Sequence, residues 1–471
     1  MAFIYLYWRV LHSKSPHSLV YGDLRMKKSL LAVAAMTAFA GAAQAQSSVT
    51  VYGILDVGVV GATNTPNING TTWGVSGSPY VSSASGRTIN SGSAFGVMSG
   101  GESMSRLGFK GSEDLGGGTK AIFLLETGFN AATGSVAGGN AGTSATNKYG
   151  NQAGDTALQG QLFGRGAYVG LSNDTYGTAT AGRQQNLMLD NIGAYDPVNA
   201  QMFSPINFSG SYGGGGYTDE SRLNGALKYV KKFGGFNVNA IYAPGGVTGQ
   251  ASTGTSSGFQ VGYEAQNYGV QGIVSHTTDA QSLTGISAGT TLTSAMGPVN
   301  GMTTAPSNAV GVTLANTTGY QLTGRYNPMD KLTLKAGYER EYIGTPSNFQ
   351  LFTSMPTTAS GYTVAGIVPN AYNKSLNVFW AGANYMFTPT IKGSIGYYYV
   401  GTLAYNGAAT AGTSQYISAM ADYYMSKRTN LYAGVMSNNN SASNGVLSTG
   451  TNNQNLITTS VTYGLGMRHT F

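Results

Sequence analysis

Few side chains in this sequence could serve as nucleophiles, bases or metal ligands. The sequence contains no Cys and four His, of which only His276 and His469 lie beyond residue 45. His276 directly follows Ser275, so on a strand the two side chains point to opposite faces. No serine and histidine share a face beside an acid, as nucleophilic catalysis requires. The acidic turn 112–114 also lacks the ligand spacing of a calcium loop. We therefore expect no enzyme activity, no metal site and no cofactor.

Charged side chains on alternating strand segments are the residues that could act chemically. Leu107 and Phe109 share one face of a segment, so Arg106 and Lys110 share the other face. Charges that line a water-filled passage are screened less than in bulk water, and they select among ions. Arg106 and Lys110 are therefore candidates for such a lining wherever this face encloses a passage.

The same alternation applies to two further segments. In the segment that begins at Arg222, it turns Leu223 outward and Arg222 and Lys228 inward. In the segment around residue 125, it turns Glu126 inward. These three charged residues join the candidates for the inner face.

The dominant pattern of the sequence is an alternation of apolar with small or polar residues at every second position. Strands with this pattern would position the charged side chains named above. About sixteen such segments have roughly the 9–11 residues that a tilted transmembrane strand needs. Short connections, such as 233–236 and 426–429, alternate with long ones, such as 187–220. Outer-membrane barrels have short periplasmic turns and long extracellular loops. The pattern predicts an all-β fold, a 16-stranded antiparallel transmembrane β-barrel.

Composition favours the same fold class. Only 9% of the residues are charged and 70 are Gly, whereas a soluble domain has about 25% charged residues. The formal net charge is +7, but residues 1–45 hold five Lys or Arg and one Asp. The remaining chain is therefore only +3, and we expect no nucleic-acid partner.

An export signal is expected near the start. A basic segment 26–29 precedes the apolar run 30–40 and the small residues 43–45, which is the pattern of a cleaved signal peptide. We therefore interpret 1–25 as an extension from a mis-assigned start codon, 26–45 as the signal peptide and 46–471 as the barrel.

Several motifs resemble the Gram-negative general porins of β-proteobacterial type. They are VTVYGILD at 49–56, SRLGFKGSEDLGGG at 105–118, ETGF at 126–129, AYVGL at 167–171, GRQ at 182–184, YMSKRT at 424–429 and GMRHTF at 466–471. The resemblance implies a homotrimer of 16-stranded, water-filled channels in the outer membrane, each with a third long loop folded inward. It also implies a general diffusion porin for ions and small hydrophilic solutes.

The resemblance also implies an arginine cluster that faces acidic residues near the inward loop. Carried over, the cluster is Arg106, Arg165 and Arg222, opposite Glu126, Asp190 and Asp196. An arginine-rich wall predicts weak anion preference. The sequence departs from the family at 185–186, which is Gln-Asn here instead of the usual Tyr-Asp. Arg183 shares parity with the outward residues Ala179 and Ala181, and we therefore expect it at the subunit interface.

The last eleven residues read as a strand that closes the barrel against the first strand. Arg468 is expected on the inner face, and Phe471 resembles the terminal signal read by the barrel-assembly machinery. Outer-membrane lipid is the expected partner of the outer face.

Two other channel or barrel classes compete with this interpretation. A channel specific for sugars or organic anions would carry a row of aromatic residues along its inner wall, and Tyr52 and Tyr398 have inward parity. A secreted adhesin would show barrel strands only near its end, whereas here they begin at Val49.

Overall fold

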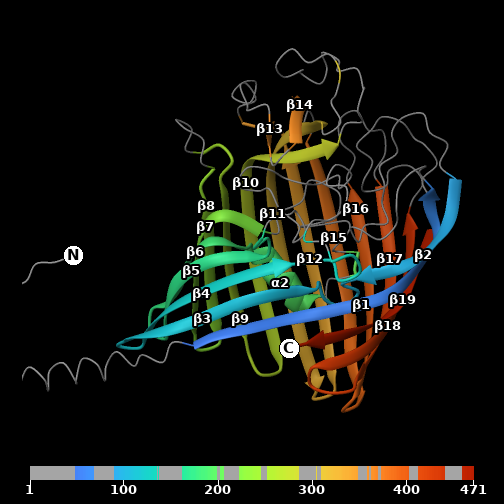
Figure 1. Ribbon diagram of the computed structural model, residues 1–471, viewed down its shortest axis with the longest axis horizontal. Coiled ribbons are helices and arrows are strands. Elements are labelled where there is room, and N and C mark those ends of the chain that lie inside the picture. Colours follow the sequence, from blue (N-terminus) through green and yellow to red (C-terminus); the bar gives the residue numbers. More distant parts are fainter. Residues whose placement is uncertain are drawn as a thin grey trace, which may run out of the picture.

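The computed structural model is a closed β-barrel (Figure 1). It describes residues 48–67, 90–134, 136, 162–198, 202–205, 222–245, 252–285, 304, 309–347, 358–359, 362–369, 373–402, 412–440 and 459–471. The predicted extension 1–25 and signal peptide 26–45 lie outside these residues. No helix among the described residues is long and apolar enough to cross a membrane.

Sixteen strands within the described residues form the wall, and each pairs antiparallel with the next. They are β1 (Ser48–Asn67), β3 (Arg106–Gly116), β4 (Thr119–Gly128), β5 (Gly166–Asn173), β6 (Gly177–Gln185), β7 (Arg222–Phe233), β8 (Phe236–Ala243), β9 (Ser256–Glu264), β10 (Tyr268–Gly285), β11 (Ala309–Met329), β12 (Leu332–Gly344), β15 (Lys374–Thr388), β16 (Ile391–Thr402), β17 (Gly412–Tyr424), β18 (Thr429–Asn440) and β19 (Thr459–Thr470). The predicted fold class is confirmed.

The last strand pairs with the first and closes the wall. β19 runs antiparallel to β1, in a register that extends from Ile54 opposite Thr470 to Thr63 opposite Val461. Closure satisfies the backbone N–H and C=O groups that an open edge would leave unpaired in lipid.

Three further strand segments extend the wall. β2 (Asn90–Ser99) pairs with the second half of β1, whereas β3 pairs with the first half of β1. β2 and β3 therefore occupy one position in the wall, interrupted by the bend Gly100–Ser105. β13 (Thr358–Ala359) pairs with β14 (Tyr362–Pro369), which runs parallel to β11.

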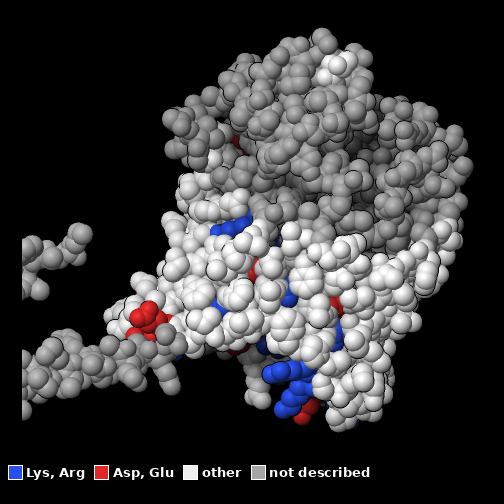
Figure 2. Space-filling model, in the orientation of Figure 1, with Lys and Arg blue, Asp and Glu red and all other residues white. Residues whose placement is uncertain are grey.

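Side chains alternate between an apolar outer face and a polar inner face. On β19, Tyr463, Leu465 and Met467 are about half exposed, whereas Thr462 is 5% exposed. Figure 2 shows that most described atoms on the visible face belong to uncharged residues; the largest group of Lys and Arg atoms lies at the lower edge, and smaller groups lie higher on the face. An apolar outer surface over a polar interior is the pattern of a barrel whose solvent outside is lipid.

One predicted strand face is wrong. Leu223 is 3% exposed and packs in one cluster with Leu187, Met188 and Ala226 on the inner side of the wall. Gly225 has φ +59° where the β6–β7 register shifts, so an extra residue forms a β-bulge. The bulge reverses the alternation N-terminal to it. Arg222 therefore lies on the face opposite Leu223, and not on the inner face as predicted.

The third long connection enters the barrel, as predicted. It begins with α2 (Leu187–Tyr195), which is capped by Asn186, whose side chain accepts a hydrogen bond from the backbone N–H of Leu189. Figure 1 shows α2 surrounded by the strands, and it contacts β8 to β12 from within.

Candidate functional site

The inward third loop is fastened to the inner wall by side chains from distant strands. The Asn191 amide donates to Gln321 (2.6 Å) and Thr323 (2.8 Å) on β11. The Trp380 indole of β15 donates to the backbone carbonyl of Tyr195 (3.2 Å). The side chains of Asn191, Gln321 and Thr323 are buried. These bonds hold α2 against the wall and narrow the interior.

Tyr195 connects the end of α2 to a second group of polar side chains. Its hydroxyl donates to the Glu264 carboxylate, which also pairs with Arg325 at 2.6 Å. Burial, reinforced by this hydrogen bond, raises the pKa of Tyr195 to about 12. The hydroxyl therefore stays protonated and remains a donor throughout the neutral range.

Directly after α2, the loop carries a buried carboxylate. Asp196 is fully buried, and its Oδ1 accepts a hydrogen bond of 2.5 Å from the Tyr398 hydroxyl on β16, which is also fully buried. Phe203 then packs against Gly434 and Gly464. Asp196 thus lies beneath the loop rather than facing the passage.

A cluster of charged residues lies on the wall formed by β1, β3, β4 and the start of β5. Arg165 pairs with Glu126 at 2.6 Å (Nε–Oε1), and both side chains are nearly buried. The Tyr52 hydroxyl donates to the other oxygen of Glu126 at 2.8 Å. Glu126 thus lies beside Arg165 and not opposite it.

Two further cations flank this pair. The Arg106 Nε donates to the backbone carbonyl of Met104 (3.0 Å), and Arg106 lies close enough to Arg165 and Glu126 to interact with both charges. Lys110 is exposed, and its ammonium lies 5.1 Å from the centre of the Tyr52 ring. Three cations and one carboxylate therefore share this part of the described wall.

Two other predicted residues meet at the start of the inward loop. The Lys228 ammonium on β7 pairs with the exposed Asp190 in the first turn of α2. It also donates to the backbone carbonyl of Gln185 at 3.0 Å. Lys228 thus has an inward position, and its charge is compensated by Asp190.

Arg183 and Arg222 are both buried by their own chain. Arg183 donates to the Gly164 carbonyl (2.7 Å) and to the Asn224 side chain (2.6 Å), and it is 8% exposed. Arg222 is 7% exposed, on the strand face opposite Leu223. Neither guanidinium joins the cluster around Glu126.

Alternation could have found several inner charges that the sequence analysis omitted. Arg325 lies between the outward residues Gly324 and Tyr326, and Lys335 lies between Leu334 and Ala336. Lys335 donates to the Asp196 carbonyl (3.0 Å). Lys392 pairs with the buried Asp422 at 2.9 Å. As predicted, Arg468 points inward, where it pairs with Glu102 at 2.9 Å.

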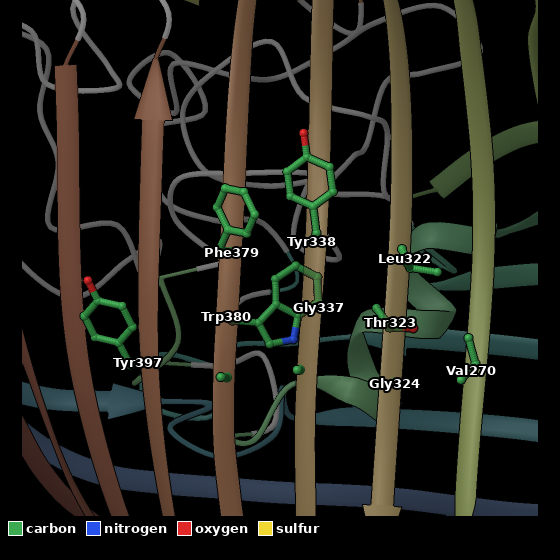
Figure 3. Close-up of a pocket in the computed structure, with 11 residues that line it drawn as sticks. Val270, Leu322, Thr323, Gly324, Gly337, Tyr338, Phe379, Trp380 and Tyr397 are labelled. Carbon is green, nitrogen blue, oxygen red and sulfur yellow. The ribbon is translucent and has the colours of Figure 1, made fainter.

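A groove of about 550 Å³ lies elsewhere, on the outer side of β10, β11, β12, β15 and β16 (Figure 3). Leu322, Phe379 and Tyr397 of its lining are about half exposed. Its wall is apolar and lacks charged residues. It belongs to the outer surface and not to the polar interior.

These features define a class of protein. The barrel is closed, its outer face is apolar, its inner face is charged, and a loop narrows its interior. Membrane pores of the β-barrel type combine these features.

Comparison with known proteins identifies the family. The Gram-negative porin profile matches residues 32–366. This chain belongs to the Gram-negative porin family, whose members are outer-membrane channel proteins rather than enzymes.

Individual relatives are similar over part of the chain. An outer membrane porin protein of Bordetella pertussis is 38% identical over 175 residues, which are 37% of this chain and 38% of that protein. Outer membrane porin protein 32 of Delftia acidovorans is 33% identical over 221 residues, 46% of this chain and 50% of that protein. The chain thus spans half or less of the length of these curated relatives.

A solved structure has the same fold. The anion-selective porin from Comamonas acidovorans superimposes with a TM-score of 0.57 at 20% identity, over 90% of this chain and 100% of that protein. At this identity the similarity concerns the fold alone.

Proposed function

We propose that the chain is a general diffusion porin, which conducts ions and small hydrophilic solutes with a weak preference for anions. The observation that carries this proposal is the excess of positive charge around Glu126. Arg165 and Arg106 interact with this one carboxylate, and Lys110 lies over the ring of Tyr52, whose hydroxyl binds Glu126. Lys228, by contrast, is compensated by Asp190. In a narrow passage such an excess attracts anions more strongly than it would in bulk water.

A substrate-specific channel is the rival function, and the positions of its two candidate aromatic residues do not favour it. Tyr398 is fully buried beneath the inward loop, and the Tyr52 hydroxyl is bound to Glu126. The two rings therefore form no continuous track for a sugar.

Recordings in planar bilayers test the proposed function. We expect step-like increases in conductance and no block by added sugars. In a salt gradient, we expect a reversal potential whose sign indicates that anions permeate more readily than cations. A clear cation preference would contradict the selectivity. Saturable block by one solute would favour the specific channel, and silent membranes would exclude both.

Arg106→Ala is expected to shift the reversal potential toward zero, because it removes one of the two uncompensated cations of the cluster. Arg340→Ala is the matched control. Arg340 is exposed on β12 opposite the outward Tyr320, so it lies on the outer face. The control should keep the wild-type reversal potential, and equal shifts in the two variants would rule out a specific role for Arg106.

We also propose a homotrimer that the barrel-assembly machinery inserts into the outer membrane, as the resemblance implies. The strands β5 and β6 are short, and their outer faces expose Val169, Leu171, Ala179 and Ala181. These small and apolar side chains suit a subunit contact, with Arg183 at its edge. A trimer-sized band on a gel run without heating, converted to monomer by heat, is the expected result.

A further inference from the structure

The wall of the barrel is interrupted at one position by an inward bend. β2 ends at Ser99 and β3 begins at Arg106, and both pair with β1. The residues between them, Gly100–Ser105, do not continue the wall. The two-residue alternation of the flanking strands does not explain this break. We therefore look at the contacts of the bend for its role.

One residue makes most of the hydrogen bonds to the bend. The Asp56 backbone pairs with Gly100 and with the Ser105 hydroxyl, and the Asp56 carboxylate binds the residues between them. Asp56 on β1 is fully buried. Its side-chain oxygens accept hydrogen bonds from the backbone N–H groups of Gly101 (3.2 Å), Glu102 (2.9 Å) and Ser103 (2.6 Å). The Tyr432 hydroxyl donates a fourth bond at 2.6 Å. Hydrogen bonds to an ionised acceptor are about twice as strong as neutral ones, so Asp56 is the main anchor of the bend.

The bend extends across the inner face of the last two strands. Glu102 is 2% exposed and accepts hydrogen bonds from Asn430 on β18 (2.7 Å) and Arg468 on β19 (2.9 Å). Asn430 also donates to Asp422 (3.0 Å). The bend thus lies inside the barrel and covers the inner surface of β18 and β19, as the third loop covers β8 to β12.

The far end of the bend contacts the cationic cluster directly. The backbone carbonyl of Met104 accepts from the Arg106 guanidinium (3.0 Å), and the Met104 sulfur lies 3.7 Å from Nη1 of Arg165. Among the described residues, this carbonyl is the one hydrogen-bond partner that fixes Arg106. The orientation of Arg106 therefore depends on where the bend is held.

We propose that the bend Gly100–Ser105 is a second constricting element, and that Asp56 is a positioning residue for Arg106 and hence for ion selectivity. This inference rests on the proposed anion preference. Asp56 is buried and does not contact the permeating ion. Its effect passes through the three hydrogen bonds from the backbone of the bend, and through the Met104 carbonyl, to the guanidinium.

Asp56→Asn gives a test whose sign separates positioning from charge. The substitution removes one negative charge, so a purely electrostatic effect would increase anion preference. The amide also presents its own N–H₂ group to backbone N–H donors, which releases the bend and lets Arg106 leave its position. We therefore expect anion preference to fall, by an amount similar to that in Arg106→Ala, and conductance to rise.

Two further variants control for charge and for folding. Asp114→Asn makes the same charge change at the exposed C-terminal end of β3 and should leave selectivity unchanged. Gly101→Ala changes no charge, but its Cβ would lie 2.2 Å from the Tyr432 hydroxyl and 2.4 Å from Met98. It should displace the bend and reduce anion preference as Asp56→Asn does. Heat-modifiable migration on gels verifies that each variant has folded.

The double variant Asp56→Asn/Arg106→Ala completes the test. If Asp56 acts through Arg106, the double variant has the reversal potential of Arg106→Ala alone. Increased or unchanged anion preference in a folded Asp56→Asn pore, or additive shifts in the double variant, would overturn the positioning role. A wild-type pore without anion preference would instead contradict the proposed function itself, so the two failures are distinguishable.

Discussion

Asp196→Ala is expected to raise the single-channel conductance and to add current noise, because it frees the inward loop. Asp196 and Tyr398 are both fully buried and share a 2.5 Å hydrogen bond. Removal of the carboxylate leaves the Tyr398 hydroxyl buried without this acceptor, at a cost of about 1–3 kcal/mol. That cost increases the population of detached loop conformations roughly five- to 150-fold.

The remaining anchors set the limits of this effect. The Trp380 and Asn191 hydrogen bonds stay in place in the variant, so we expect fluctuation between two conductance levels and not permanent loss of the loop. The measurement is the single-channel conductance histogram in planar bilayers.

Tyr398→Phe supplies the control for Asp196→Ala. It keeps the aromatic ring and removes the hydroxyl that donates to Asp196. If the two residues act together, each single variant and the double variant have similar open-level distributions. A conductance histogram in Asp196→Ala that matches the wild type would show that the loop needs no anchor at this position.

Much of the barrel could be predicted because alternation is a local property of the chain. Inward and outward positions of β3 and β19 follow from two-residue periodicity alone. The face predicted for Leu223 was wrong because a β-bulge at Gly225 adds one residue to β7. Glycine within a strand pattern is a known sign of a bulge, but its presence does not state which residues change face.

The candidate site was less predictable because its contacts join distant segments. Glu126 could be placed on the inner face, but its pairing with Arg165, 39 residues away, depends on how β5 begins. Asp196 was expected in the passage, yet it is buried against Tyr398, 202 residues away. The alternation of side chains along a strand predicts which face of the wall a charged residue occupies. Whether a loop then covers that residue depends on tertiary packing, which alternation does not predict.

Deletion of Phe471 is expected to reduce the yield of assembled barrel strongly. Phe471 and Gly53 exchange two backbone hydrogen bonds of 3.1 Å at the seam between β1 and β19. The ring covers Gly53, where a Cβ would lie 2.3 Å from Cζ of Phe471. Each lost bond costs about 0.5–1.5 kcal/mol, and unpaired backbone groups are added at the junction that must close in lipid. The measurement is the fraction of chain recovered as heat-modifiable barrel.

Phe471→Ala separates closure of the seam from recognition during assembly. It retains both backbone hydrogen bonds and removes only the ring, which is 45% exposed. If the ring is read by the assembly machinery, Phe471→Ala lowers the yield in cells as much as the deletion does, whereas refolding in detergent is little affected. Phe387→Ala removes another exposed aromatic ring near a short turn and should assemble normally. A normal cellular yield of Phe471→Ala, together with a poor yield of the deletion, would show that Phe471 acts only by closing the seam between β1 and β19.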